Sequence, residues 1–428
     1  MLGLIGLVFG VFVLVGLPLS FAMAMATVAA IWLGGQYDPI IVGHRILQAS
    51  DSFVLLAIPF FILAGSLMER GGIARRLVHF AHVLVKQIRG GMAMVAIIGE
   101  VLFSGISGST AADVSAIGSL MMPTLNRAGY RPAESASIIA AASAMGILVP
   151  PCVMMIVLGG LLNVSVTALF AAGLLPALFM AAVLLAYCWV RAGQLGITGE
   201  GWASRREFLI AFVDALLPLG MPVIIFGGIF GGVVTPTEAG AIAVLYALVV
   251  GGLIYREITL RLLWHSFLET AIVTSAVMFL VGGSTAWSWF AATEHLPQAL
   301  LELMLSISGD PSVFLILSVI IFILGGALLE GLPAAIVLLP VLLPTIEGMH
   351  INLVHFGTLV VAATGVGLFL PPAGVGLIVV CGVGKVGIEP VVRAFIPYLA
   401  LLVFTLVVLT YVPQITLILP NILGISVR

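Results

Sequence analysis

The sequence has 428 residues, of which 62% are hydrophobic and only 8% are charged, and its formal net charge is −2. Soluble domains carry roughly 25% charged residues, far more than this chain. Together with a mean hydropathy of +1.30, this composition indicates a membrane protein. The balanced charge gives no support for a nucleic-acid partner. Three isolated cysteines in apolar runs argue against disulfides or a metal cluster.

Apolar runs of about 20 residues, long enough for a ~30 Å hydrocarbon core, recur from end to end and predict an all-α polytopic membrane protein. The first spans are expected at about 2–18, 20–35 and 52–68. Residues 73–90 follow, with apolar side chains at helical spacing and basic residues between them. This pattern favours an amphipathic helix lying in the membrane interface.

An apolar stretch at 90–123 is interrupted by a cluster of glycines and small hydroxyl residues. Each limb is short for a membrane span and basic residues flank both ends, so we expect a re-entrant helical hairpin. Its tip carries Ser104, Gly105, Ser107, Gly108, Ser109 and Thr110. Asp113 follows on the returning limb, either as an ion-site residue or as a helix cap. Glu100 lies in the entering limb, where it faces a cavity or pairs with an arginine.

The span expected at 134–162 is broken at Pro150-Pro151. Backbone groups freed by such a break inside a membrane must be buried in protein or line a polar cavity. Transporters build ion and substrate sites from broken helices of this kind. A further span is expected at 165–190, and residues 192–207 form the most polar loop.

The second half repeats this order of elements. Spans are expected at 216–233, 237–255 and 266–290, a second hairpin at 311–345 with its tip near 325–331, a span at 352–384 broken at Pro371-Pro372, and a last span at 395–412. Glu238 follows Pro236 at a helix start, where capping is favoured over ion binding. Glu330 stands at the second tip, where supporting an ion site and capping the hairpin are equally plausible roles.

Positive charge orients the chain, because cytoplasmic loops carry an excess of lysine and arginine. Segments 70–89, 191–206 and 256–261 hold these residues, whereas 294–310 and 330–350 hold none. The first hairpin is therefore expected to enter from the cytoplasm and the second from outside, with the N-terminus outside.

An internal repeat supports this topology. Residues 121–160 align with 342–381 without a gap when they are shifted by 221. The helix-breaking residues coincide in this alignment: Pro123 with Pro344, Gly146 with Gly367, and Pro150-Pro151 with Pro371-Pro372. The two copies lie in opposite orientations by the charge count, as inverted repeats do.

The two breaks and the two tips together predict a binding site near the membrane midplane. Unwound backbone at 146–150 and 367–371 exposes carbonyl oxygens that suit a hard cation such as Na⁺. Helix N-termini present N–H groups and a positive dipole end, which suit a carboxylate. The candidate sodium- and substrate-binding residues are Ser104, Ser107, Gly108, Ser109, Thr110, Asp113, Gly146, Val149, Pro150, Glu330, Gly331, Thr364, Gly367, Leu370 and Pro371.

Several motifs in this order resemble the large membrane subunit of TRAP (tripartite ATP-independent periplasmic) transporters. They are GISGSTAADVSAIG at 105–118, VPP at 149–151, TPTEA at 235–239 and GLFLPPAG at 367–374. The resemblance covers essentially the whole chain. Two departures stand out: Glu330 replaces the usual Asp at the second tip, and Thr364 is the only polar side chain before the second proline pair.

The resemblance implies an elevator-type transporter with inverted repeats and two re-entrant hairpins, in the inner membrane of a bacterium. It implies partners as well: a small four-helix membrane subunit, expected as a separate chain, and a periplasmic substrate-binding protein. The substrate would be an organic acid such as a C4-dicarboxylate or sialic acid. No cofactor is implied beyond Na⁺ as the coupling ion.

The expected division of the chain follows its elements. It comprises a scaffold segment with the interfacial helix (1–89), the first hairpin and broken span (90–191), a loop with further scaffold spans and a second interfacial segment (192–310), the second hairpin and broken span (311–386) and the C-terminal span (387–428).

Two other functions are weighed against this interpretation. A stand-alone sodium/organic anion symporter of the divalent-anion type would need no receptor. An intramembrane serine protease would use the GISG sequence at 105–108, but that chemistry requires a histidine near the serine. None of the seven histidines lies in the middle of a predicted span, so an enzyme is not expected.

Overall fold

The computed structural model describes residues 2–35, 37–107, 110–296, 298–299, 302 and 309–427, and within these ranges it is helical and contains no strand. Eight helices of the described part are long and apolar enough to cross a membrane. The predicted all-α polytopic class is therefore confirmed.

The first half begins with α1 (Leu2–Leu14), α2 (Leu19–Gly34), α3 (Ile40–Ser50), a 3-10 turn η1 (Phe53–Leu56) continued by α4 (Ala57–Arg70), and α5 (Ile73–Val85). It continues with α6 (Gly91–Ser107), α7 (Thr110–Arg127), α8 (Pro132–Gly146), α9 (Val153–Leu162) and α10 (Val166–Gln194). Here α6 and α7 are the limbs of the first predicted hairpin, and α8 and α9 are the halves of the first broken span.

The second half comprises α11 (Arg205–Phe230), α12 (Pro236–Ala247) with a π-helical end η2 (Leu248–Ile254), and α13 (Leu260–Thr293). It then forms α15 (Pro311–Leu329), α16 (Gly331–Gly348), α17 (Leu353–Gly367), α18 (Val375–Gly384), α19 (Ile388–Tyr411) and α20 (Gln414–Ile422). Here α15 and α16 form the second hairpin, and α17 and α18 the second broken helix. Re-entry of the hairpins into the membrane remains a prediction.

The helix bounds repeat at the offset found in the sequence. Helices α7 and α16 begin and end 221 residues apart, and so do α8 and α17. Both breaks also carry the same turn: Val149 N–H donates to Gly146 O at 2.8 Å, and Leu370 N–H donates to Gly367 O at 2.9 Å. In both, the peptide bond between the two prolines is cis. The segment α7–α8 and the segment α16–α17 thus share one arrangement of helices and turn.

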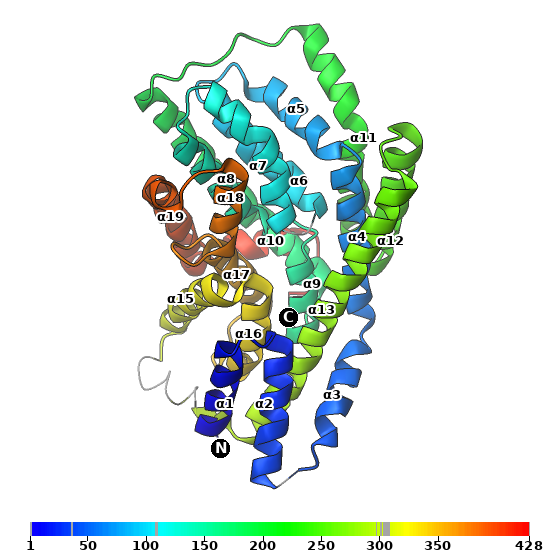
Figure 1. The fold of residues 1–428 in the computed structure, drawn as a ribbon, viewed down its shortest axis with the longest axis vertical. Coiled ribbons are helices and arrows are strands. Elements are labelled where there is room, and N and C mark those ends of the chain that lie inside the picture. Colours follow the sequence, from blue (N-terminus) through cyan, green and yellow to red (C-terminus); the bar gives the residue numbers. More distant parts are fainter. Residues whose placement is uncertain are drawn as a thin grey trace.

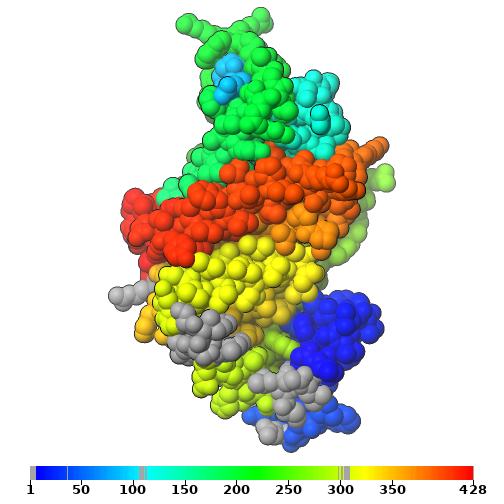
Figure 2. All heavy atoms as spheres, turned by 90° about the vertical axis from the view of Figure 1, so that its left-hand side faces the viewer, coloured from blue at the N-terminus to red at the C-terminus, as the bar shows by residue number. Residues whose placement is uncertain are grey.

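The core of the molecule is formed by the first parts of the two broken helices. Residues 134–146 of α8 and 354–367 of α17 are buried without exception, and the two helices contact each other. Their alanine, serine and glycine side chains permit the close approach of helices that stabilises packing in a membrane. Figure 2 shows α19 (orange) and α15 (yellow) crossing the outside of this core as adjacent bands.

The basic segments lie together. Figure 1 shows α5, residues 195–204 and the turn between α12 and α13 at one end of the molecule, while α1, α2 and the end of α13 lie toward the other. This grouping agrees with the positive-inside assignment, whose absolute orientation remains a prediction.

Several helices differ from those expected: α13 begins at Leu260 rather than 266, and α3 was not predicted. Helix α11 begins at Arg205 rather than near 216, because Ser204 accepts the N–H of Glu207 and caps a polar first turn. Helix α19 begins at Ile388 rather than 395. Helix α20 was not predicted, because its nine residues contain Pro420 and are too short to span a membrane.

The expected capping by Glu238 is confirmed: its carboxylate accepts the Thr235 N–H in a capping box.

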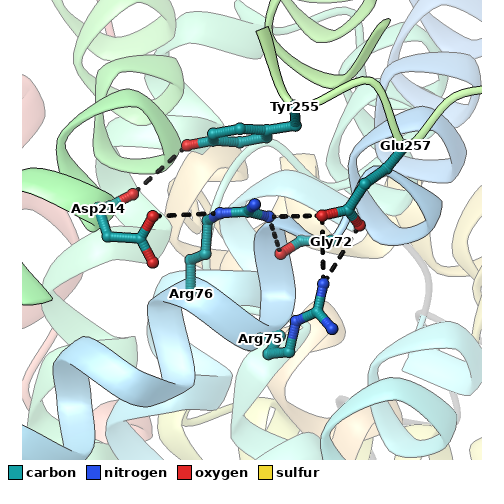
Figure 3. A network of polar contacts seen from close by, with 6 residues as sticks. All are labelled: Gly72, Arg75, Arg76, Asp214, Tyr255 and Glu257. Atoms are coloured by element: carbon teal, nitrogen blue, oxygen red, sulfur yellow. Dashed lines mark hydrogen bonds and ion pairs between the residues drawn. The ribbon is translucent and has the colours of Figure 1, made fainter.

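The amphipathic helix α5 is anchored at its N-terminal end by Arg76. Figure 3 shows the Arg76 guanidinium between Asp214 of α11 and Glu257 of the α12–α13 turn, with the ring of Tyr255 above it. The ion-pair distances are 3.3 and 3.1 Å, and the guanidinium carbon lies 3.6 Å from the ring centroid. The same guanidinium donates to Gly72 O at 2.9 Å. Helix α5, helix α11 and the α12–α13 turn are therefore joined through one side chain.

Replacing Arg76 with methionine is expected to lower the free energy of unfolding by about 1 to 2 kcal/mol, because a desolvated cation–π contact of this kind is lost together with its ion pairs. Arg75 is the matched control: it also binds Glu257, but its side chain is 66% exposed. Arg75→Met should change the free energy by less than about 0.5 kcal/mol. Denaturant titration in detergent, followed by circular dichroism, measures both, and equal effects would contradict the anchoring role.

Candidate binding site

A cavity of about 430 Å³ lies between α4 and α13 on one side and the hairpins and breaks on the other. Thr110 of the first hairpin and Glu330 and Gly331 of the second line its wall. The first break contributes Ile147 and 152–154, and the second contributes Leu368, Val375, Gly376 and Val379. The sequence predicted that two tips and two breaks share one site, and these four elements do meet here.

Four helices begin at this cavity. Thr110, Val153, Gly331 and Val375 are the first residues of α7, α9, α16 and α18, and each lines the wall. The first N–H groups of a helix have no partner within the helix, and the helix dipole adds a partial positive charge there. Four such ends at one cavity form a favourable environment for an anion.

The charged side chains at the cavity are acidic. Glu69, Glu269 and Glu330 line it, and among its described lining residues there is no lysine, arginine or histidine. Arg70, which is not among the lining residues, donates to Glu269 at 2.6 Å, while the Ser66 hydroxyl donates to that of Ser266 at 3.0 Å. Backbone N–H groups and hydroxyls, rather than basic side chains, are therefore the groups available to bind an anion.

The first hairpin packs against the first break through glycines. A Cβ atom at Gly105 would lie 2.9 Å from Pro150 O, and one at Gly146 would collide with the hydroxyl of Ser104. Only glycine permits this approach, because a side chain would separate the hairpin from the break. The predicted residues Ser104, Gly146, Val149 and Pro150 are thus brought together.

Ser104 and Asp113 bind each other. The Ser104 hydroxyl donates to Asp113 Oδ2 at 2.7 Å, and the two residues are 3% and 2% exposed. They lie behind the cavity wall, not on its surface. Of the other predicted tip residues, Ser107 ends α6, and Gly108 and Ser109 lie outside the described residues.

The second hairpin packs against the second break in the same way. A Cβ atom at Gly326 would lie 2.8 Å from Thr364 O. Thr364 is fully buried, but its hydroxyl donates to Val360 O of its own helix at 2.7 Å. The prediction that Thr364 binds an ion therefore depends on the lone pairs of its hydroxyl oxygen, since the hydroxyl hydrogen is already donated. The predicted Gly367, Leu370 and Pro371 form the turn described above.

Glu330 is the single residue that joins α15 to α16. Its backbone lies at φ 71° and ψ 159°, a conformation that normally requires glycine. Its side chain is exposed to the cavity. The surrounding structure must stabilise this backbone conformation of Glu330 against its free-energy cost. Strained backbone of this kind is typical of functional sites.

Sequence reasoning missed the wall contributed by α4 and α13. Ser66, Glu69 and Glu269 line the cavity, yet none was predicted as a site residue. An acidic residue inside an apolar span was the available signal for Glu269. Glu100 was weighed without an assigned role, and it is fully buried beside Ser104.

Comparison with known proteins places this architecture in a family. The model of the tripartite ATP-independent periplasmic transporter, DctM component, matches residues 6–415. The chain is 34% identical to the 2,3-diketo-L-gulonate TRAP transporter large permease protein YiaN of Escherichia coli K12, covering 94% of each chain. It is 36% identical to the sialic acid large permease SiaM of Vibrio cholerae, over 98% of this chain and 97% of that one.

Two further comparisons agree with this family assignment. The chain is 35% identical to the C4-dicarboxylate large permease DctM of Pseudomonas aeruginosa, covering 89% of this chain and 90% of that one. The crystal structure of the YdaH transporter of Alcanivorax borkumensis shares the fold, with a TM-score of 0.63 and 16% identity over 87% of each chain.

These permeases are transporters and not enzymes, so the protease interpretation of GISG is set aside. The eight candidate spans and the bacterial family identify a multi-pass protein of the inner membrane. This chain belongs to the DctM family and is the large permease subunit of a TRAP transporter.

Proposed function

We propose that this permease imports an organic acid together with Na⁺. The convergence of four helix N-termini on one cavity supports an anionic substrate. The carbonyl-rich turns at the two breaks, which end α8 and α17 beside the cavity, support bound cations. Relatives named for a C4-dicarboxylate, sialic acid and 2,3-diketo-L-gulonate all handle carboxylates, which agrees with this substrate class.

The proposed movement is an elevator motion. The two hairpins and the two broken helices contact one another across the repeat, through α7 with α18, α8 with α17 and α18, and α9 with α17. They would move together as a transport domain carrying the cavity. Helices α4, α5 and α11–α13 would remain still as a scaffold, with α5 held by the Arg76 contacts.

The proposed partners are a small four-helix membrane subunit and a periplasmic substrate-binding protein that delivers the acid. This proposal follows from membership in a tripartite transporter family. The alternative, a stand-alone symporter, predicts transport by the permease without a receptor.

Reconstitution in proteoliposomes tests the proposal. With the small subunit and receptor present, an inward Na⁺ gradient should drive uptake of a labelled probe acid chosen from succinate, N-acetylneuraminate and 2,3-diketogulonate. Uptake that is independent of Na⁺ would contradict sodium coupling. Full uptake without the receptor would instead favour the stand-alone symporter.

A further inference from the structure

A groove of about 470 Å³ lies between the end of the amphipathic helix α5 and the start of α11. Its walls are apolar: Val83 and Leu84 come from α5, and Phe208 and Leu209 come from α11. It shares no lining residue with the cavity between the hairpins. Figure 1 shows α5 and residues 195–204 together at one end of the molecule. The groove is therefore separate from the proposed substrate site.

The groove continues an apolar contact that α5 and α11 make apart from the main core. Phe80 and Val83 of α5 pack with Ala211 and Ala215 of α11 in a small cluster of buried side chains. The ring centroids of Phe80 and Phe208 lie 6.4 Å apart. Val83 and Phe208 also belong to the wall of the groove. An alkyl chain in the groove would therefore extend this cluster, and burial of its methylene groups is favourable.

The charged side chain among the described residues that line the groove is basic. Arg205 belongs to the first turn of α11 and is exposed. The acidic groups nearby have other partners: Glu207 binds Lys86 at 2.5 Å, and the carboxylate of Glu200 lies 3.3 Å from His82 Nε2. No ion pair of Arg205 occurs within the described part of the chain. The groove thus carries positive charge that suits a phosphate group.

Exposed tryptophans indicate that the groove lies at the level of the lipid headgroups. Trp202 lines the groove and is 85% exposed, and Trp264, in the first turns of α13, is 68% exposed. The guanidinium carbon of Arg89 lies 3.5 Å from the ring centroid of Trp189. Tryptophan and arginine side chains in this arrangement are typical of the membrane–water interface. A groove at this level can meet both the headgroup and the acyl chain of one lipid.

We propose that this groove binds an anionic phospholipid such as phosphatidylglycerol. The phosphate lies against the guanidinium of Arg205, because hydrogen bonds between these two groups are charge-assisted and strong. One acyl chain follows the apolar wall past Leu84 and Leu209. The net negative charge of the lipid matches the unpaired arginine, and its alkyl chain matches an apolar groove that a soluble phosphate would leave empty.

The bound lipid would connect α5 to α11. Two ion pairs already join these helices, Arg76 with Asp214 and Lys86 with Glu207. The lipid adds an apolar contact to both helices at the groove and so stabilises the interfacial helix on its neighbour. Binding of the lipid does not depend on the proposed transport of an acid with Na⁺, because neither ligand enters the groove.

Quenching of Trp202 fluorescence by brominated lipids tests the site in the intact permease, without Na⁺ or substrate. Bromine near the headgroup end of an acyl chain quenches a tryptophan that it contacts, and Trp202→Phe supplies the background of the other tryptophans. In reconstituted vesicles, brominated phosphatidylglycerol should quench Trp202 with an apparent affinity about fivefold above that of brominated phosphatidylcholine. This is the factor that one arginine contributes at an anionic lipid surface.

Two matched pairs of variants separate the headgroup contact from the acyl-chain contact. Arg205→Gln should abolish the preference for phosphatidylglycerol, whereas Arg206→Gln should keep it, because Arg206 is also exposed but does not line the groove. Leu209→Gln should weaken quenching by both lipids, whereas Ile210→Gln should not. These two side chains are 58% and 57% exposed, and of the two only Leu209 lines the groove.

Four results would overturn the proposal. Equal quenching of the wild-type protein by the two lipids would exclude an anionic site, and equal loss of the preference in Arg205→Gln and Arg206→Gln would show only general surface charge. Displacement of the lipid by excess inorganic phosphate would assign the groove to a free anion. Absence of quenching by both lipids would mean that protein, such as a second copy of this chain, covers the groove. The first and last results need no arginine variant, so a folding defect in Arg205→Gln leaves the test intact.

Discussion

Gly367→Ala is expected to reduce uptake at least about tenfold. A methyl group at this position would collide with the backbone oxygen of Ile323 and lie 3.1 Å from the Cα of Gly326. Both obstacles are backbone atoms of α15, so no side chain can rotate away, and the second hairpin must separate from α17. Overpacking of this kind costs about 1 to 3 kcal/mol, and each 1.4 kcal/mol is a tenfold change in an equilibrium.

The displacement matters because the same hairpin carries Glu330 and Gly331 to the cavity wall. Gly382→Ala is the matched control: Gly382 also lies in a helix of the second broken span, but a Cβ atom there meets nothing within 4 Å. Initial rates of uptake in proteoliposomes, normalised to reconstituted protein, compare the two. A wild-type uptake rate in Gly367→Ala would contradict the prediction, because uptake would then not require the second hairpin to pack closely on α17.

The helices and their breaks could be predicted from the sequence because the signals are local. Apolar length predicts spans, and the paired prolines predict the two breaks. The 221-residue offset, seen first in residue identities, recurs in the bounds of α7, α8, α16 and α17. Hydropathy alone placed the start of α11 near residue 216 instead of at Arg205, because the first turn of this helix is polar.

The site was predictable only in part. Thr110, Glu330 and Gly331 were expected at a shared site and line one cavity. The opposite wall was not foreseen, because no pattern in the sequence shows that α4 and α13 face the tips. The contact between Glu100 and Ser104 likewise depends on how α6 turns toward α7 and α8, which packing determines. Sequence shows that a buried acid is unusual but does not identify its partners.

The first hairpin and broken helix hold more buried polar side chains than the second hairpin and broken helix do. Ser104, Asp113 and Ser143 accompany the first break, whereas Thr364 is the buried hydroxyl residue beside the second. Any cation bound at the second break would therefore depend on backbone oxygens and on the nearest acidic side chain. Glu330, at the tip of the same hairpin, is the candidate for that electrostatic role.

Glu330→Gln is therefore expected to raise the half-saturating Na⁺ concentration for uptake at least about tenfold, with a smaller effect on that for the substrate. The substitution preserves size and removes the charge. Two opposite charges about 4 Å apart interact by on the order of 4 kcal/mol at an effective dielectric constant of 20, so even a partial interaction exceeds the 1.4 kcal/mol that a tenfold change requires. Glu330→Asp retains the charge and should restore most of the Na⁺ affinity.

Glu347→Gln is the matched control for charge, because Glu347 lies near the other end of α16 and is exposed. It should leave the Na⁺ dependence unchanged. The competing explanation is that Glu330 only stabilises the N-terminal end of α16 through the helix dipole. In that case Glu330→Gln would lower the melting temperature while uptake kept the wild-type Na⁺ dependence. Na⁺ titration of uptake together with thermal unfolding separates the two roles, because only an ion-site role moves the Na⁺ half-saturation.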